Sequence, residues 1–286
     1  MMNFFIVKDP VQFLNVVEDL LMRNEVANSL SIGILKSLIN KDESLRIEGE
    51  PFMAYVGEKN HPYLVLLQTP PLNLVISGTH EFFEQTAPIA VNHLETMNIP
   101  GFIGVKELVE PIVTLFNETY HTYATLEMDQ RIYQLEQVTA PQNVTGHLRK
   151  ATNADLTLIK DWIKAFDLEA IGEPTSEEKA QKRAEIGVAS EAYYLWEDHG
   201  IPVSMAKSSR PTDRGITVTM VYTPKEQRGG GYASACVAAL SQKLLDLGYD
   251  YCTLYTDLSN PISNSIYQKI GYQAIADSVA YKLVKQ

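Results

Sequence analysis

The sequence from residue 222 to residue 234 reads Tyr222-Thr223-Pro224-Lys225-Glu226-Gln227-Arg228-Gly229-Gly230-Gly231-Tyr232-Ala233-Ser234. It joins a predicted strand at 216–223 to a predicted helix at 233–247. Glycine permits positive φ angles and close backbone approach, so these amide groups and the following helix N-terminus could converge on a diphosphate. The stretch is not a Walker loop, since no Lys-Ser/Thr pair follows the glycines, and it lacks the G-x-G-x-x-G pattern. A flexible turn would have the same composition, so the spacing alone leaves both interpretations open.

A second stretch predicts a short helix. It reads Asn260-Pro261-Ile262-Ser263-Asn264-Ser265-Ile266-Tyr267-Gln268-Lys269-Ile270-Gly271-Tyr272. Asn is a favoured N-cap, Pro fits the first helical position, and Gly commonly ends a helix. Ser263 and Tyr267 lie one helical turn apart, so the phenol could project toward whatever the glycine stretch holds. A packing tyrosine, and a cap that holds no ligand at Asn260, are the alternative interpretations.

The chain of 286 residues favours two domains, at about 150 residues per domain. The turn-forming residues 139–146 show no periodicity and are the predicted linker. This places an N-terminal α/β domain at 1–140 and a second domain at 146–286. The two halves share a similar order of helices and strands without a residue-level repeat.

Local patterns predict the individual elements. Asp9-Pro10 predicts the N-terminus of a helix and an all-helical beginning. Two extended runs are predicted at 123–128 and 132–138, at the end of the first half. In the second half, Asn153 is the predicted N-cap of one helix, and Thr175-Ser176-Glu177-Glu178 is the predicted capping box of the next.

Composition excludes several classes. The 35 acidic and 24 basic residues give a net charge of -11, which repels nucleic acid and favours a cationic small substrate. Cys236 and Cys252 are the only cysteines, and neither they nor the histidines have zinc-ligand spacing, so no metal is expected. No signal peptide is recognisable, and no apolar run reaches the roughly 18 residues of a membrane span. The sequence therefore predicts a cytoplasmic protein with no membrane or nucleic-acid partner.

Together, the two stretches resemble the GNAT family of acetyl-CoA-dependent N-acetyltransferases. The likeness rests on Arg228-x-x-Gly231-x-Ala233 after one strand and on Asn260 to Tyr272 after the next, and it covers roughly residues 147–283. It implies an α/β (α+β) fold with a mixed, mostly antiparallel sheet flanked by helices. The element order of the first half extends this expectation to two such domains in tandem.

The resemblance implies acetyl-CoA as co-substrate. It implies a diphosphate site made by Arg228, Gly229, Gly230, Gly231, Tyr232, Ala233 and Ser234. It further implies that the strand end pairs with the pantetheine arm, which concerns Val221, Tyr222 and Thr223. Asn260, Asn264 and Tyr267 would line the same arm.

The resemblance also implies direct attack by the amine on the thioester, in a ternary complex. A backbone amide near Val221 would stabilise the oxyanion, and Tyr267 would protonate the departing thiolate. Glu169 or Asp257 could accept the amine proton through water. Solvated surface charge is the alternative interpretation of both carboxylates.

Two functions fit the sequence. The first is an N-acetyltransferase that acts on a primary amine of a small molecule or peptide. The second is a non-catalytic module that binds acyl-CoA. The first half lacks the Arg and glycine series at Ser77-Gly78-Thr79-His80, so it is expected to be a degenerate GNAT-like domain that walls the substrate cleft and has no cofactor site. An unrelated α/β domain is the alternative there, and a monomer or a homodimer is expected.

Overall fold

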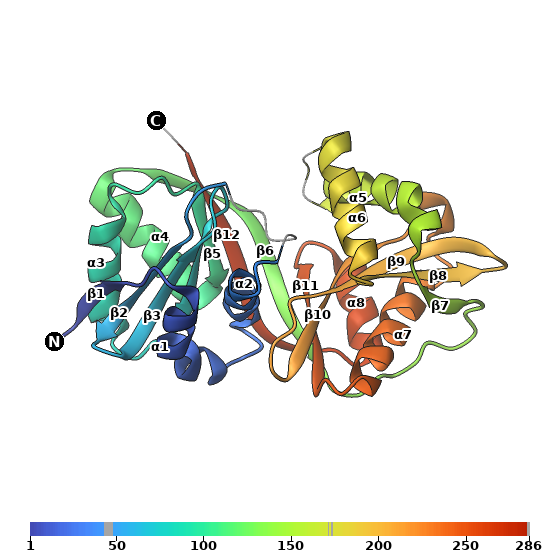
Figure 1. Cartoon of the computed structure of the whole chain (residues 1–286), viewed down its shortest axis with the longest axis horizontal. Coiled ribbons are helices and arrows are strands. Elements are labelled where there is room, and N and C mark those ends of the chain that lie inside the picture. The colour runs from blue at the N-terminus through green and yellow to red at the C-terminus, as the bar shows by residue number, and fades with distance from the viewer. Residues whose placement is uncertain (43–47, 171, 173, 285–286) are drawn as a thin grey trace. The chain divides into compact units, whose positions relative to one another are not determined.

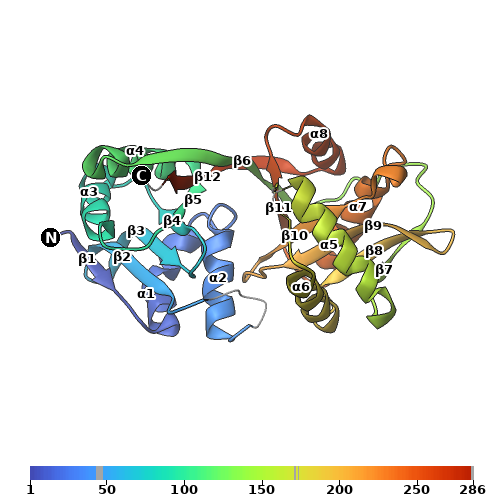
Figure 2. The same cartoon turned by 90° about the horizontal axis from the view of Figure 1, so that it is seen from above.

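The computed structural model describes residues 1–42, 48–170, 172 and 174–284 and folds into two compact units (Figure 1, Figure 2). Unit 1 comprises Met1–Ile132, Thr256–Asn260 and the segment that starts at Ala274. Unit 2 comprises Tyr133–Tyr255 and Pro261–Gln273. No helix among the described residues is long and apolar enough to span a membrane.

Unit 1 is a mostly antiparallel sheet with helices on both faces. Its strands are β1 (Asn3–Ile6), β2 (Phe52–Glu58), β3 (His61–Gln68), β4 (Leu74–Gly78), β5 (Gly101–Val105), most of β6 (Tyr123–Leu135) and most of β12 (Gln273–Val284). Its helices are α1 (Pro10–Met22), α2 (Ser29–Ile39), α3 (Phe83–Leu94) and α4 (Lys106–Tyr120). The strand order is β1-β2-β3-β4-β5-β12-β6, and β4 and β5 are a parallel pair.

Successive apolar side chains of the central strands point to opposite faces of the sheet and form two hydrophobic cores in unit 1. On β2, Met53 and Tyr55 pack with α1 and α2, whereas Ala54 and Val56 pack with α3 and α4. Successive side chains of a strand point to opposite faces. The strand is therefore apolar without interruption, because helices cover both of its faces.

Unit 2 has the same organisation. Its strands are β7 (His147–Lys150), β8 (Tyr193–Asp198), β9 (Ile201–Ser209), β10 (Gly215–Tyr222) and most of β11 (Tyr251–Asp257). Its helices are α5 (Leu156–Ala170), α6 (Glu177–Ala189), α7 (Tyr232–Asp246) and α8 (Pro261–Ile270), with 3-10 turns η1 (Asn153–Asp155) and η2 (Lys225–Gln227). The strands are ordered β11-β10-β9-β8-β7, and β10 and β11 are the parallel pair. Helices α5 and α6 pack on one face, and α7 and α8 pack on the other.

These observations confirm the predicted fold class. The compact units are not two continuous halves, however. The last strand of the chain, β12, lies in unit 1 from Ala274 on and pairs antiparallel with β5, from Ser278 opposite Val105 to Lys282 opposite Gly101. The predicted linker 139–146 lies in unit 2, where the Trp196 indole donates to the Thr145 carbonyl at 2.9 Å.

Two helix starts differ from the sequence prediction. Thr152, not Asn153, begins the first, because Thr152 and Asp155 form a reciprocal capping box around a 3-10 turn. In the second, the Ser176 hydroxyl accepts from the Lys179 amide, while the Thr175 hydroxyl donates to Asp167. The Thr175 side chain, which was expected to cap α6, therefore hydrogen-bonds to a buried carboxylate on the neighbouring helix α5 instead.

The predicted opening and the predicted end of the first half are also wrong in detail. The opening is not all-helical, because β1 precedes α1 and pairs with β2. The runs at 123–128 and 132–138 form the single strand β6 up to Leu135. The polar residues between them remain in the strand because Asp129 binds Lys106 and Arg131 binds Asp277.

Candidate functional site

Strands β10 and β11 form parallel ladder pairs only along their beginnings, among the described residues. Residues 215–217 pair with 251–253. Among the described residues, the strands then continue to Tyr222 and Asp257 without further parallel ladder pairs. On its other side, β10 has a register shift against β9 between Thr219 and Tyr222, where Met220 has a φ of +52°. This bulge bends the strand and leaves the backbone around Val221 outside the β10–β11 ladder.

The chain leaves β10 and enters α7 through a left-handed turn. Gly229 has a φ of +87° and Gly231, the N-cap of α7, has a φ of +79°. Non-glycine residues rarely adopt such angles. The first amides of α7 have no partner within the helix, and they include those of Tyr232, Ala233 and Ser234. The turn therefore brings the predicted anion-binding amides together at one helix N-terminus.

Tyr232 fixes the start of α7. Its hydroxyl donates to the Asp198 carboxylate at 2.7 Å, which lowers the pKa of Asp198 and raises that of Tyr232. The N-terminal end of α7 also contacts the 139–146 segment, because a Cβ at Gly231 would lie 3.0 Å from a methyl group of Val144. The side chain of Tyr232 therefore anchors the turn, and only its backbone amide is available to an anion.

Arg228 joins three segments of unit 2. Its Nε donates to the Thr223 carbonyl at 2.9 Å, and its terminal nitrogen binds the Glu169 carboxylate at 2.5 Å. Glu169 lies in the last turn of α5. The predicted base and the predicted cofactor residue therefore form an ion pair.

The end of β10 is held by buried polar contacts. The Ser204 hydroxyl donates to the Tyr222 carbonyl at 3.1 Å and lies 2.9 Å from the Thr223 hydroxyl. The Tyr222 ring packs on Trp162 of α5, with ring centroids 5.9 Å apart. The side chain of Tyr222 therefore belongs to the core, and this residue has only its backbone to offer a ligand.

Tyr267 lies in the core that contains the beginning of α7. Its side chain is buried, and Cys236, one turn into α7, lies near enough to affect its titration. Burial raises the pKa of the Tyr267 phenol to about 12. None of the described residues hydrogen-bonds to this hydroxyl. The phenol is therefore a protonated donor at neutral pH.

Asn264 is held by a residue distant in sequence. The Tyr133 hydroxyl donates to the Asn264 side-chain oxygen at 3.0 Å and accepts from the Gln268 amide at 3.3 Å. Tyr133 is fully buried in the same core as Tyr267. This network fixes the side-chain amide of Asn264 on α8, one turn before Tyr267.

Two of the predicted site residues group with unit 1. Asp257 and Asn260 belong to the segment Thr256–Asn260. The Asp257 carboxylate accepts from the Ser259 amide at 2.7 Å, and the Asn260 amide donates to the Asp257 carbonyl at 3.1 Å. Asp257 thus has a structural part in the turn that precedes α8.

Neither cysteine is a nucleophile in this structure. Cys236 and Cys252 are buried free thiols, and burial raises the pKa of each to about 12. Reactive cysteines have lowered pKa values. No group of His, Cys, Asp or Glu residues suited to a metal ion occurs in the described part of the chain.

Comparison with known proteins agrees with this geometry. Residues 204–281 match the family described as FR47-like protein. The GCN5-related N-acetyltransferase from Sphaerobacter thermophilus is 13% identical, with 99% of this chain and 96% of that chain aligned at a TM-score of 0.63. The chain has a tandem GNAT fold. No curated protein matches the sequence.

Two further solved GNAT structures extend over the whole chain. The acetyltransferase from Colwellia psychrerythraea is 12% identical, covers 99% of this chain and 100% of its own, and has a TM-score of 0.58. A tandem GNAT protein from the clavulanic acid biosynthesis pathway is 10% identical, with coverages of 99% and 98% and a TM-score of 0.57. The resemblance inferred from the sequence is therefore confirmed at the level of the fold.

The first GNAT unit has a different turn at the corresponding place. Strand β4 ends at Gly78, which is followed by Thr79-His80-Glu81, and the residue before α3 is Phe82, with a φ of +56°. Glu84 lies in the first turn of α3. Carboxylates at a helix N-terminus repel anions, and this turn has an aromatic side chain where unit 2 has Gly231.

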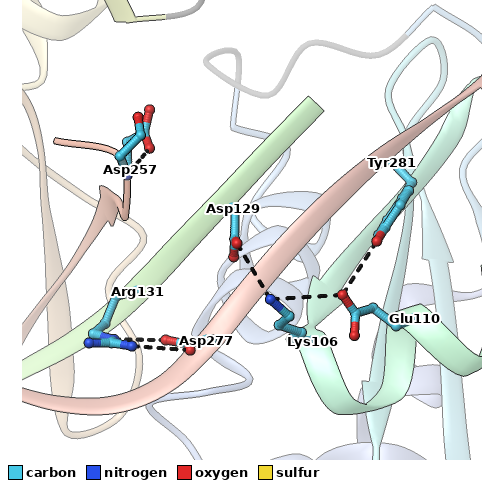
Figure 3. Close-up of polar contacts among 8 residues, drawn as sticks. Lys106, Glu110, Asp129, Arg131, Asp257, Asp277 and Tyr281 are labelled. Atoms are coloured by element: carbon cyan, nitrogen blue, oxygen red, sulfur yellow. Dashed lines mark hydrogen bonds and ion pairs between the residues drawn. The ribbon is translucent and has the colours of Figure 1, made fainter. Parts of the chain in front are cut away.

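The end of β5 in the first GNAT unit is occupied by ion pairs, as Figure 3 shows. Helix α4 begins at Lys106 directly after β5, and its ammonium lies 3.4 Å from Asp129 and 3.8 Å from Glu110. Glu110 accepts from the Tyr281 hydroxyl at 3.3 Å. Three residues, 258–260, lie between β11 and α8, so the chain continues differently after β11 than after β5.

Several residues that build the site carry no local sequence signal. Ser204, Asp198 and Tyr133 reach it only through the fold. Their partners lie 18, 34 and 131 residues away in the chain. The Trp162–Tyr222 contact could have been anticipated only from the apolar face of the 156–170 helix.

Proposed function

We propose that the chain is an acetyl-CoA-dependent N-acetyltransferase whose single cofactor site lies in unit 2. The observation that carries this proposal is the left-handed Gly229–Gly231 turn, which presents the first amides of α7 beside a strand that has left its parallel ladder. The amides suit a diphosphate, and the unpaired edge of β10 suits the amides of a pantetheine arm. In unit 1 the N-cap of α3 is Phe82 in place of a glycine, and Glu84 lies in the first turn of that helix, so we propose no site there.

Direct transfer from the thioester to the amine needs three groups. A backbone amide at Val221 would donate to the carbonyl oxygen as negative charge develops on it. The C–N bond forms, the C–S bond breaks, and the Tyr267 phenol would give its proton to the departing sulfur. With a pKa raised to about 12, the phenol is protonated at neutral pH and has the proton that a general acid must donate.

The amine must lose a proton to a base. Glu169 stands at the end of α5, and its charge helps to raise the pKa of Tyr222, so it lies near the end of β10. We propose Glu169, acting through water, in preference to Asp257, which is engaged in the turn before α8. The carboxylate is paired with Arg228 in this structure, so this ion pair has to break before Glu169 can accept a proton.

The acceptor is proposed to be a primary amine of a small molecule or peptide. Unit 1 contains 19 acidic and 10 basic residues, whereas unit 2 contains 16 and 14. Nearly all of the negative net charge therefore belongs to one unit, and it raises the local concentration of cations. This asymmetry supports a positively charged acceptor.

Thiol release from acetyl-CoA across a panel of polyamines, aminoglycosides and basic peptides tests the proposal. We expect turnover with one class and a loss of about 10²-fold or more in Tyr267→Phe. Tyr272→Phe is the matched control, because Tyr272 is a buried tyrosine of the same core whose hydroxyl contacts Ser241. Binding of acetyl-CoA without turnover on any amine would favour the non-catalytic module instead.

A further inference from the structure

The Arg228 side chain binds a backbone carbonyl and a carboxylate. The Nε bond to the Thr223 carbonyl fixes the guanidinium beside the end of β10. The outer nitrogen is left to bind Glu169, 59 residues earlier in the chain. Gly229, the first glycine of the turn proposed to bind the diphosphate, follows Arg228 directly in the chain.

The ion pair is weak enough to be exchanged. The Arg228 side chain is 46% exposed and that of Glu169 is 33% exposed. Exposed pairs of this kind contribute about 0–1 kcal/mol. A diphosphate has more negative charge than one carboxylate, and guanidinium groups bind phosphate oxygens in bidentate geometry. A diphosphate on the turn would therefore compete successfully for Arg228.

We propose that Glu169 occupies Arg228 in the free protein and is displaced when acetyl-CoA binds. This inference rests on the proposed function. The displaced carboxylate becomes available near Tyr222, whose titration already responds to its charge. It then binds the acceptor ammonium, or its proton, only after the cofactor is in place. The consequence is an ordered reaction in which acetyl-CoA binds before the amine.

Calorimetric titration with acetyl-CoA tests the competition. Glu169→Gln removes the competitor, so we expect the Kd for acetyl-CoA to fall about 3- to 5-fold, the equivalent of up to ~1 kcal/mol. Glu226→Gln is the matched control. It also removes one negative charge, from the 3-10 turn η2 two residues before Arg228. In an Arg228→Gln background, Glu169→Gln should leave the Kd unchanged.

Three outcomes would overturn the inference: an unchanged Kd in Glu169→Gln, a fall equalled by Glu226→Gln, or a fall that persists in Arg228→Gln. Failure of the wild-type chain to bind acetyl-CoA would instead overturn the proposed function and this inference with it. Steady-state kinetics with the amine that turns over give a second readout. We expect a dead-end amine analogue to inhibit uncompetitively against acetyl-CoA in the wild type. Competitive inhibition would contradict the order.

Discussion

Gly231 is the residue on which the geometry of the site depends most. It adopts a φ of +79° as the N-cap of α7, and a Cβ placed there would lie 3.0 Å from the Val144 methyl group. A left-handed conformation costs an L-residue about 1–2 kcal/mol. We therefore expect Gly231→Ala to lower the free energy of unfolding by at least that amount, because Val144 must also move.

The same substitution should affect ligand binding more than stability. If the alanine leaves the left-handed region, the amides that follow rotate away from a common point. Thermal unfolding should shift by about 2–4 °C for each kcal/mol, and calorimetry should show acetyl-CoA binding weakened at least 10-fold. Both measurements use the full chain.

Gly230→Ala is the internal control. Gly230 is not among the glycines with positive φ, and the three atoms nearest to a Cβ placed there all belong to the Tyr232 ring, the first at 3.1 Å. Such a replacement can be neutral or slightly stabilising, because alanine restricts the unfolded chain. Equal effects of the two substitutions, or wild-type binding in Gly231→Ala, would refute the argument.

Further outcomes follow from individual contacts. Tyr267→Phe should leave the Kd for acetyl-CoA, measured by calorimetry, within about 2-fold of the wild type, while turnover, measured by thiol release, falls about 10²-fold. Equal losses of affinity and turnover would indicate that Tyr267 has only a packing role. Hydrogen bonds from Arg149 lower the pKa of the buried Asp155 carboxyl to about 2, against an ordinary value of 3.8. The Asp155 carboxylate therefore contributes about 2 kcal/mol to the free energy of unfolding above pH 4. Denaturant titrations of the wild type should show this contribution disappear as the pH falls from 4 to 2, and Asp155→Asn should not show this loss. Arg183→Met leaves Asp167, whose side chain is 3% exposed, without its cation and should cost about 3 kcal/mol; Asp167→Asn should cost less, because Arg183 is 41% exposed and can turn to solvent.

Local signals in the sequence predicted much of the backbone geometry of the glycine turn. The three glycines at 229–231 were expected to permit positive φ angles; Gly229 and Gly231 adopt them, and Gly230 does not. Asn260-Pro261 and Gly271 predicted a helix that the structure places at Pro261–Ile270. These signals succeed because they depend on backbone geometry at single positions, which neighbouring segments do not alter.

Signals that depend on distant partners failed. Thr175 has a good capping sequence, yet Asp167 attracts its hydroxyl, and no property of residues 175–178 reveals this. The placement of β12 beside β5 was equally inaccessible, because pairing between residues 278 and 105 depends on the whole chain. The Glu169–Arg228 ion pair belongs to the same class.

The most direct test of the account is the stoichiometry of acetyl-CoA binding by the intact chain, measured by calorimetry. The geometry of unit 2 and the altered turn of unit 1 lead us to expect saturable binding of one acetyl-CoA per chain, lost in Gly231→Ala. Two sites per chain would contradict the assignment of the cofactor to unit 2 alone. No binding at millimolar acetyl-CoA would contradict the proposed function.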